Sequence, residues 1–406
     1  MAEKIVLAYS GGLDTSVAIK WLAERYSAEI IALTLDVGGS RALERARQRA
    51  LKAGASQALV VDAKDQFAKE YVWPALQSGA IYEGEYPLAT ALARPLIVWH
   101  QVKVALEVGA FAVAHGCTGK GNDQVRFDVN TAALAPHLKI IAPAREWGMS
   151  REQEIEYAKS HGVPLELGTR SSYSVDENLW GRSIEAGDLE DPWREPPEEA
   201  FAWTRPVKDA PEEPRYVEIT FRQGIPVALD GEEMPGVLLI ERLHQWAGEH
   251  GVGRVDHIEN RLVGIKSREV YEAPAALVLH KAHKALEAMT LSKDQARMKE
   301  RVAQEYADVV YNGLWFTQHR QDLDAYVQST QRHVSGTVRV RLHKGAATVV
   351  GRRSDEALYQ YQLATYDKAD QFDHKASEGF IAIYGLPVRT QARIQGREGK
   401  GPGQRG

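Results

Sequence analysis

The first half of the chain alternates short apolar runs with longer segments of helical periodicity. The apolar runs predict buried strands at Lys4–Tyr9, Glu29–Asp36, Ser56–Asp62, Phe111–His115 and Ile140–Ala142. Helical spacing of apolar positions follows at 17–22, Arg41–Ala53, Thr90–Val108 and, after the capping box Ser150-x-x-Gln153, up to His161. Strands that alternate with helices predict an α/β fold with a doubly wound, mainly parallel sheet.

The pattern changes after Gly168. Strands are predicted at Tyr216–Phe221, Ile225–Leu229, Thr337–Leu342 and Ala346–Val350, and helices near Pro235–Gly248, Pro274–Met289, Ser292–Asp308 and Gln318–Ser329. This mixture predicts a second domain of the α+β class. Beyond it, Ser377–Ile394 has an apolar face that the neighbouring sequence cannot cover, so we expect a helix or arm that docks on another subunit.

Composition and charge narrow the functional classes. The chain has 406 residues, 44% of them apolar and 26% charged, as in ordinary soluble proteins. A net charge of −5 gives no sign of the basic surface that binds nucleic acid. No apolar run reaches the length of about 20 residues that a membrane helix needs. The single cysteine, Cys117, excludes an intrachain disulfide. We therefore expect a cytoplasmic protein with no nucleic-acid and no membrane partner.

The first candidate for chemistry is Ser10–Ser16, which reads Ser-Gly-Gly-Leu-Asp-Thr-Ser between the first strand and the first helix. Glycines let a backbone approach an anion closely, and the first N–H groups of a helix point at such an anion. The alternative is an ordinary turn with Asp14 or Thr15 as N-cap. The additional hydroxyl groups of Ser10 and Ser16 favour phosphate binding, although the Walker pattern is absent.

The second candidate is His115–Phe127, which follows the fourth strand. Because the carboxyl ends of parallel strands share one edge of a sheet, this segment should lie beside Ser10–Ser16. Arg126 can pair with a carboxylate, and Asp123 can hold an ammonium group. The alternative is a solvated surface loop.

The loop at Ser10–Ser16 resembles the pyrophosphate loop of the ATP pyrophosphatases. Five stretches in order then make the chain similar to argininosuccinate synthase from about Lys4 to Gly385. They are Ala8–Ser16, Thr90–Pro95 (Thr-Ala-Leu-Ala-Arg-Pro), Thr118–Phe127, Asp176–Leu179 (Asp-Glu-Asn-Leu) and Glu259–Tyr271.

This resemblance implies a ligase of arginine biosynthesis that joins citrulline and aspartate while ATP becomes AMP and pyrophosphate. The citrulline ureido oxygen would take the adenylate, and the aspartate amine would then displace AMP. Neither step requires a protein nucleophile, so catalysis would rest on positioning and on neutralisation of phosphate charge. The resemblance also implies Mg²⁺ as cofactor beside ATP and a homotetramer.

The resemblance assigns the following site residues. ATP-binding residues would be Ala8, Tyr9, Ser10, Gly11, Gly12, Leu13, Asp14, Thr15, Ser16, Leu35 and Gly116. Aspartate-binding residues would be Thr118, Asn122 and Asp123. Citrulline-binding residues would be Tyr86, Ala91, Asn122, Arg126, Ser174, Ser183, Glu259 and Tyr271. The catalytic set would be Asp14, Asp123 and Arg126. Magnesium would be held mainly through the ATP phosphates, near Asp14, so no residue is assigned as a certain metal ligand.

Several positions depart from the family pattern. Ala91 replaces a hydroxyl residue that contacts citrulline, and Gly38-Gly39 replaces Gly-Gln. Two rival functions remain open. One is another ATP pyrophosphatase, although Ala2 leaves no glutaminase cysteine at position 2. The other is a non-catalytic nucleotide-binding protein, which would bind ATP without citrulline-dependent release of pyrophosphate.

The resemblance also suggests a division of the chain. We expect a nucleotide-binding domain at 1–167, a synthetase domain at 168–364, a C-terminal oligomerisation helix or arm at 365–395 and a disordered tail at 396–406, which is rich in glycine.

Overall fold

A computed structural model of the chain describes residues 3–39, 42–164 and 173–396. Its contacts divide it into two compact units, Met1–Glu356 and Ala357–Gly406. The expected boundary at 167/168 and almost all of the expected tail lie outside the described residues, and the domain division stays a prediction.

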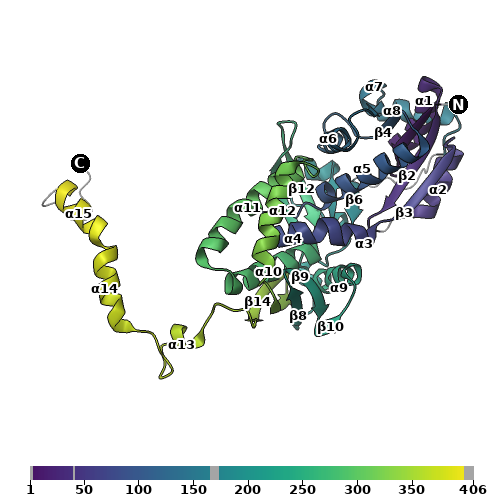
Figure 1. Cartoon of the computed structure of the whole chain (residues 1–406). Coiled ribbons are helices and arrows are strands. Elements are labelled where there is room, and N and C mark those ends of the chain that lie inside the picture. The colour runs from purple at the N-terminus through teal and green to yellow at the C-terminus, as the bar shows by residue number, and fades with distance from the viewer. Residues whose placement is uncertain (1–2, 40–41, 165–172, 397–406) are drawn as a thin grey trace. The chain divides into compact units, whose positions relative to one another are not determined.

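The first sheet is parallel and has the strand order β3-β2-β1-β4-β5 (Figure 1). Its strands are β1 (Lys4–Ala8), β2 (Glu29–Asp36), β3 (Gln57–Asp62), β4 (Ala112–His115) and β5 (Lys139–Ile141). Its helices are α1 (Leu13–Tyr26), α2 (Leu43–Lys52), α5 (Ala89–Val108), α6 (Asp123–Leu134), α7 (Pro143–Glu146) and α8 (Arg151–Ser160). The predicted start of α2 at Arg41 lies outside the described residues. The predicted doubly wound sheet is confirmed, and its strand order reverses between β1 and β4, where ligands bind in such folds.

The central strand β1 is buried on both faces, as strands of parallel sheets are. Ile5 and Leu7 pack into one apolar cluster with residues of α1 and α8. Val6 and Ala8 pack into the larger cluster on the other face, with residues of α5. The sheet therefore has helices on both sides and leaves only its edges for ligands.

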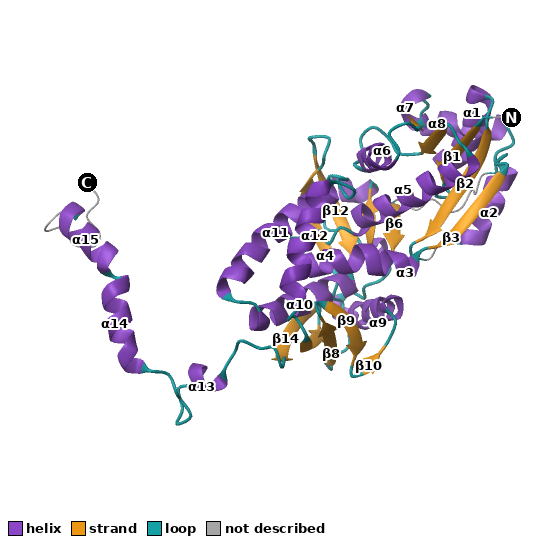
Figure 2. Cartoon of the chain, viewed as in Figure 1, coloured by secondary structure: helices purple, strands orange, loops and turns teal. Residues whose placement is uncertain are grey.

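The remainder of the first unit contains two antiparallel sheets and a set of helices (Figure 2). One sheet has the order β10-β9-β8-β13-β14, with β8 (Arg215–Arg222), β9 (Ile225–Leu229), β10 (Glu232–Glu233), β13 (Gly336–His343) and β14 (Ala346–Arg353). The other has the order β11-β12-β7-β6, with β6 (Ser174–Asn178), β7 (Gly181–Glu185), β11 (Arg254–Asn260) and β12 (Lys266–Glu272). The helices are α9 (Gly236–Glu249), α10 (Pro274–Thr290), α11 (Lys293–Tyr311) and α12 (Gln318–Gln331). All four predicted strands fall in the first of these sheets, and the second sheet was not predicted.

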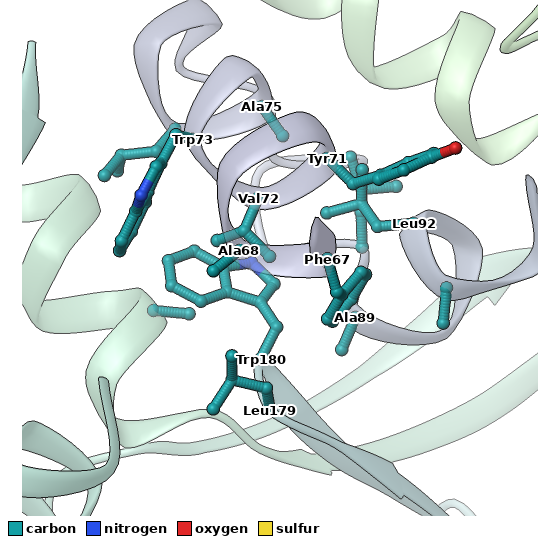
Figure 3. Close-up of a cluster of buried hydrophobic side chains, with 14 of the residues drawn as sticks. Phe67, Ala68, Tyr71, Val72, Trp73, Ala75, Ala89, Leu92, Leu179 and Trp180 are labelled. Atoms are coloured by element: carbon teal, nitrogen blue, oxygen red, sulfur yellow. The ribbon is translucent and has the colours of Figure 1, made fainter. Parts of the chain in front are cut away.

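A cluster of large apolar side chains fixes the β6–β7 hairpin against the start of α5 (Figure 3). The neighbouring helical segments are α3 (Lys64–Phe67), a π-helical turn (Ala68–Val72) and α4 (Trp73–Ser78). Trp180, fully buried in the hairpin turn, meets the Trp73 ring edge-on at 6.4 Å between centroids and donates from Nε1 to the Pro87 carbonyl at 2.9 Å. Asn178 Nδ2 donates to the Ala89 carbonyl at 2.8 Å. The hairpin and α5 are thereby held as one rigid frame.

The second unit contains α13 (Tyr361–Ala364), α14 (His374–Tyr384) and α15 (Leu386–Gln395). The helical form of the predicted segment Ser377–Ile394 is confirmed, with its interruption at Gly385. In the described part of the chain, no helix combines the length and apolarity that crossing a membrane requires.

Candidate active site

The segment from Ser10 to Ser16 is held in shape by its own hydroxyl groups. The Ser16 hydroxyl donates to the Gly12 carbonyl at 2.7 Å, and the Tyr9 and Ser16 hydroxyls lie 2.9 Å apart. Ser10 Oγ accepts from the Gly12 N–H at 3.3 Å and lies 3.2 Å from Thr15 Oγ1. Gly11 has φ +83°, in the left-handed region that favours glycine. The turn is therefore folded before any ligand arrives, with the N-terminus of α1 opening at Gly12.

This turn forms one wall of a cavity of about 210 Å³, which we call the loop cavity. Its lining residues are Ala8, Tyr9, Ser10, Gly12, Leu13, Asp14, Thr15, Leu33, Leu35, Arg94, Ile97, His115, Gly116, Cys117, Asp123, Phe127 and Asp176. Leu33 and Leu35 at the end of β2 supply apolar surface. Ile97 and Phe127 supply more from α5 and α6. The cavity thus combines an anion-binding turn with an apolar slot at the switch point of the sheet.

A second cavity of about 230 Å³ adjoins the first, and we call it the sheet cavity. Its lining residues are Tyr86, Thr90, Arg94, Cys117, Thr118, Gly121, Asn122, Asp123, Arg126, Ser174, Asp176, Ser183, Glu185, Glu259, Arg261, Glu269 and Tyr271. Arg94, Cys117, Asp123 and Asp176 line both cavities. A ligand in one cavity can therefore meet a ligand in the other at these four residues.

The small antiparallel sheet supplies one whole wall of the sheet cavity. Side chains two residues apart on a strand share a face, which pairs Ser174 with Asp176, Ser183 with Glu185 and Glu269 with Tyr271. Ser183 lies between Asp176 and Tyr271 in the strand register. The strands β6, β7 and β12 therefore present a continuous polar row to the cavity.

Two guanidinium groups hold Asp123 at the junction of the cavities. Arg94 donates to Asp123 Oδ2 from Nε at 2.9 Å and from Nη2 at 2.7 Å, and Nη2 also reaches Asp176. Arg126 Nη1 donates to Asp123 Oδ1 at 2.9 Å. Burial alone would raise the pKa of Asp123, but the two cations outweigh it and hold the pKa below its ordinary value. Asp123 is therefore an ionised carboxylate.

Arg126 retains one group for a ligand. Its Nε donates to the Tyr311 carbonyl at 2.9 Å, and its side chain is only 3% exposed. Its Nη2 is buried and has no hydrogen-bond partner among the described residues. An unpaired donor in a buried guanidinium is costly, and a ligand carboxylate that accepts from Nη2 would remove that cost.

Glu259 is buried among hydroxyl donors in the same cavity. The Tyr271 hydroxyl donates to Oε2 at 2.6 Å, and the Tyr311 hydroxyl donates to Oε1. Burial raises the pKa of Glu259, whereas hydrogen bonds from His257, Tyr271 and Tyr311 lower it, and the net shift is downward. Tyr86 stacks on Tyr271 at 4.3 Å between centroids and fixes that ring. The result is a second ionised carboxylate in a preorganised position.

A pair of carboxyl groups lies at the start of α1. Burial, together with the negative charge and the hydrogen bond of Asp14, raises the pKa of Glu154 on α8 to about 7. The two groups supply oxygen ligands beside the turn, which suits Mg²⁺ when phosphate oxygens complete the coordination. Among the described residues, no cluster of three or more His, Cys, Asp or Glu forms a metal site without such a ligand.

The structure brings most of the predicted site residues to the cavity walls. Gly11 and Ser16 are buried within the turn itself and do not line the loop cavity as described. Ala91 is buried in α5, and its N–H donates to the Tyr86 hydroxyl oxygen at 3.4 Å. Its neighbour Thr90 lines the sheet cavity, whereas Ala91 is not among the described lining residues.

Burial raises the pKa of the Cys117 thiol, which keeps the thiol protonated and makes it a poor nucleophile. Gly39 has φ +99° and lies against Glu177, whose Cγ would be 3.0 Å from an added Cβ.

Sequence reasoning missed several residues that line the same walls. They are Arg94, Asp176, Glu185, Arg261 and Glu269. A signal existed for three of them. Asp176 follows Ser174 and Glu185 follows Ser183 at the spacing that shares a strand face. Arg94 lies one turn after Thr90 on α5 and so shares its helix face. No local signal marks Tyr311, which arrives from the end of α11.

Comparisons with known proteins agree along the chain. Residues 4–164 match the family profile described as the arginosuccinate synthase N-terminal HUP domain, and residues 173–391 match the arginosuccinate synthase C-terminal domain. An argininosuccinate synthase of Dehalococcoides mccartyi (strain CBDB1) is 60% identical over 395 residues, which cover 97% of each chain. That of Symbiobacterium thermophilum is 59% identical over 97% of this chain and 98% of its own. That of Gloeobacter violaceus is 57% identical over 97% of this chain and 99% of its own. On these matches, the chain belongs to the argininosuccinate synthase family.

Proposed function

We propose that the loop cavity and the sheet cavity together form the active site of the family's reaction, with ATP in the first and both amino acids in the second. The enzymes of this family condense citrulline and aspartate to argininosuccinate in arginine biosynthesis, with ATP cleaved to AMP and pyrophosphate. The observation that carries the assignment is the buried, unpartnered Nη2 of Arg126 in a cavity that adjoins an anion-binding turn.

In this proposal, ATP lies along the loop cavity. The adenine occupies the apolar slot between Leu35 and Phe127, and the phosphates lie at Ser10–Ser16. The α-phosphate then reaches the junction at Arg94. Backbone N–H groups and the N-terminus of α1 neutralise phosphate charge without a protein nucleophile.

Citrulline is assigned to the sheet cavity with the carboxylate and the ammonium group of its α-carbon between Arg126 and Glu259. Its carboxylate pairs with Arg126 Nη2, and its α-ammonium pairs with Glu259, which is ionised and anchored by two tyrosine hydroxyls. Ser174 and Ser183 contribute hydroxyls from the wall of the sheet. The ureido group is then directed toward the junction with the loop cavity. The predicted contact from Ala91 is limited to its backbone.

Aspartate is assigned to Thr118, Asn122 and Asp123 at the rim of the same cavity. The lowered pKa of Asp123 makes it a weak proton acceptor, so its proposed role is to hold the aspartate ammonium next to the junction. The cavity walls carry five carboxylates, of Asp123, Asp176, Glu185, Glu259 and Glu269, against three guanidiniums, of Arg94, Arg126 and Arg261. The guanidiniums suit the three carboxylates that citrulline and aspartate bring together, and the carboxyl groups of the walls suit their two ammonium groups.

The chemistry follows from these positions. The ureido oxygen forms a bond to the α-phosphorus while the bond to the β-phosphate oxygen breaks, and its electron pair leaves with pyrophosphate. The aspartate ammonium gives up one proton to solvent and becomes an amine. Its nitrogen then bonds to the activated carbon and loses a second proton, while the carbon–oxygen bond breaks and its electron pair leaves with AMP. Arg94 lies where both steps occur and stabilises the negative charge on the α-phosphate oxygens. Both steps depend on holding reacting atoms in contact.

Magnesium is proposed as a partner of ATP. Asp14 and Glu154 provide carboxylate oxygens beside the turn, and Mg²⁺ is commonly held by one or two carboxylates together with substrate phosphates. When bound, the ion would neutralise phosphate charge.

Assembly through the second unit is a further part of the proposal. Its helices expose large apolar side chains, namely Phe380, Ile381, Ile383, Tyr384, Leu386, Val388 and Ile394. A patch of that kind marks an interaction surface, and we assign it to other copies of the chain in a cytoplasmic homotetramer. Light scattering tests this with the full chain and with a Phe380→Asp, Ile383→Asp variant. A tetramer that dissociates in the variant is expected, and a wild-type monomer would contradict the assignment.

The direct test of the function measures pyrophosphate release from ATP. Release that requires citrulline, with argininosuccinate formed once aspartate is added, is expected. Binding of ATP without citrulline-dependent cleavage would instead favour a non-catalytic nucleotide-binding protein.

A further inference from the structure

A third hollow lies on the side of the phosphate-binding turn that faces α2, and we call it the arginine hollow. It has a volume of about 180 Å³ and is lined by Ser10, Gly11, Thr34, Ala42, Leu43, Arg45, Ala46 and Arg49. Ser10 also lines the loop cavity, so the two spaces lie next to each other on either side of the turn.

Helix α2 packs closely against the turn at this point. A Cβ added at Gly11 would come within 3.2 Å of Ala46 Cβ, which is tight contact. Arg49 Nη1 donates to the Gly11 carbonyl oxygen, so its guanidinium is anchored on the turn itself. The position of α2 therefore fixes the hollow relative to the phosphate-binding backbone.

Arg45 precedes Arg49 by four residues, so the two side chains share one helix face. In the described part of the chain, Arg45 has no acidic partner. Arg47 differs, because it faces away and is paired with Glu44 through Nε at 3.0 Å and Nη2 at 3.0 Å. The face of α2 that borders the turn thus carries two guanidinium groups, those of Arg45 and Arg49.

The loop cavity does not supply comparable positive charge to the phosphates. Its lining cation is Arg94, which is already shared by Asp123 and Asp176. The two phosphates beyond the α-phosphate carry most of the charge of ATP, and pyrophosphate leaves with an additional electron pair. Guanidinium groups match phosphate oxygens in charge and in geometry.

We propose that Arg45 and Arg49 receive the β- and γ-phosphates of ATP and hold the pyrophosphate after the bond between the α- and β-phosphates breaks. This inference rests on the proposed function, because it assigns the nucleotide to the phosphate-binding turn. It adds a separate pyrophosphate subsite on α2. The nucleoside and the α-phosphate remain in the loop cavity, so AMP does not touch the two arginines.

The test compares binding of inorganic pyrophosphate and of AMP to the full-length enzyme by calorimetry, without citrulline or aspartate. Arg45→Ala and Arg49→Ala are each expected to weaken pyrophosphate binding by about tenfold to a hundredfold and to leave AMP binding within about twofold. Arg47→Ala on the same helix is the matched control and should change neither. Arg49→Lys keeps the charge but loses the planar fork, and it should recover part of the loss.

The outcomes separate this inference from the proposed function. Equal weakening of AMP and pyrophosphate in both alanine variants would mean that the arginines only support the turn, and the subsite would be wrong. Unchanged pyrophosphate binding in Arg45→Ala and Arg49→Ala would overturn it as well, while citrulline-dependent turnover by the wild type would leave the function standing. Pyrophosphate binding lost in the variants of a protein without such turnover would support the subsite and remove the function.

Discussion

The loop cavity and the sheet cavity differ in the groups that line them and in the ligands that those groups suit. The loop cavity is built mainly from a continuous turn, backbone groups and apolar walls. Its ionisable side chains away from the junction are those of Tyr9, Asp14 and His115. The sheet cavity is built from side chains of α5, α6 and a four-stranded sheet, and most of its charges neutralise one another. A site that binds its ligand through backbone groups tolerates the loss of a side-chain group, but not a bulkier residue that pushes the backbone away. A charge network tolerates neither the loss nor the displacement of one member.

The largest effect is expected from Arg126→Met in the sheet cavity. The change leaves Asp123 with one cation and removes the only Arg126 donor that has no partner among the described residues. Breaking a buried charge pair costs about 3–5 kcal/mol, so kcat/KM for citrulline should fall by about 10²- to 10⁴-fold. Steady-state kinetics measure this loss. Arg145→Met, which affects the half-exposed pair with Asp128 outside both cavities, is the control. A similar fall in the control would indicate a general structural effect.

Arg94→Gln tests the junction between the cavities. The amide keeps some hydrogen bonding but loses the cation that Asp123 and Asp176 share, so we expect kcat to fall by about tenfold to a hundredfold. Asp123 has a lowered pKa, and its ionised form therefore stabilises the fold above the ordinary aspartate pKa and loses that effect as pH falls through the lowered value. Without Arg94 the loss should begin at a higher pH. An acid limb of the kcat/KM profile at the wild-type position would contradict this role.

Gly116→Ala tests the loop cavity by volume alone. An added Cβ at Gly116 would lie 2.7 Å from Thr15 Cγ2, so the turn must move. Overpacking of this kind costs about 1–3 kcal/mol, and the KM for ATP should rise by about tenfold or more while the KM for citrulline changes little. Gly119→Ala is the matched control, because no described heavy atom lies within 4 Å of its added Cβ. Equal ATP kinetics in the two variants would show that the turn is not in contact with the nucleotide.

The smallest effect concerns Glu154 beside Asp14. Its pKa is raised to about 7, so the protonated form stabilises the fold below the ordinary glutamate pKa, and that contribution disappears as pH rises through about 7. Glu154→Gln should therefore reduce the fall in the urea midpoint between pH 5.5 and pH 8.5. Glu156→Gln on the exposed face of α8 serves as control. An unchanged pH dependence in Glu154→Gln would show that the carboxyl is not buried against Asp14.

The difference between the loop cavity and the sheet cavity also explains which parts of the structure the sequence could predict. The strand at Glu29–Asp36, the turn at Ser10–Ser16 and the parallel sheet are readable because apolar runs and glycines are local signals. The sheet β11-β12-β7-β6 was missed because strands such as Arg254–Asn260 and Lys266–Glu272 carry charged residues where a core strand would carry apolar ones. Those polar positions line the cavity, so the feature that builds the site also hides the strand pattern.

Individual contacts in the site also could not be predicted where they depend on how distant segments pack. The resemblance to a known family located Arg126 and Glu259, but the sharing of Asp123 between Arg94 and Arg126 depends on how α5 and α6 pack. The reach of Tyr311 from the end of α11 to Glu259 joins residues far apart in the chain. Interactions of this kind have no local sequence signal.

The central claim is that a ligand in the sheet cavity attacks the α-phosphate of a nucleotide in the loop cavity. It is tested most directly by one turnover with citrulline carrying ¹⁸O in its ureido oxygen, together with ATP and aspartate, and by mass spectrometry of the products. We predict that the ¹⁸O appears in the phosphate of AMP, because the ureido oxygen bonds to the α-phosphorus and leaves with it. Label in pyrophosphate or in water, with unlabelled AMP, would contradict the joined arrangement of the two cavities.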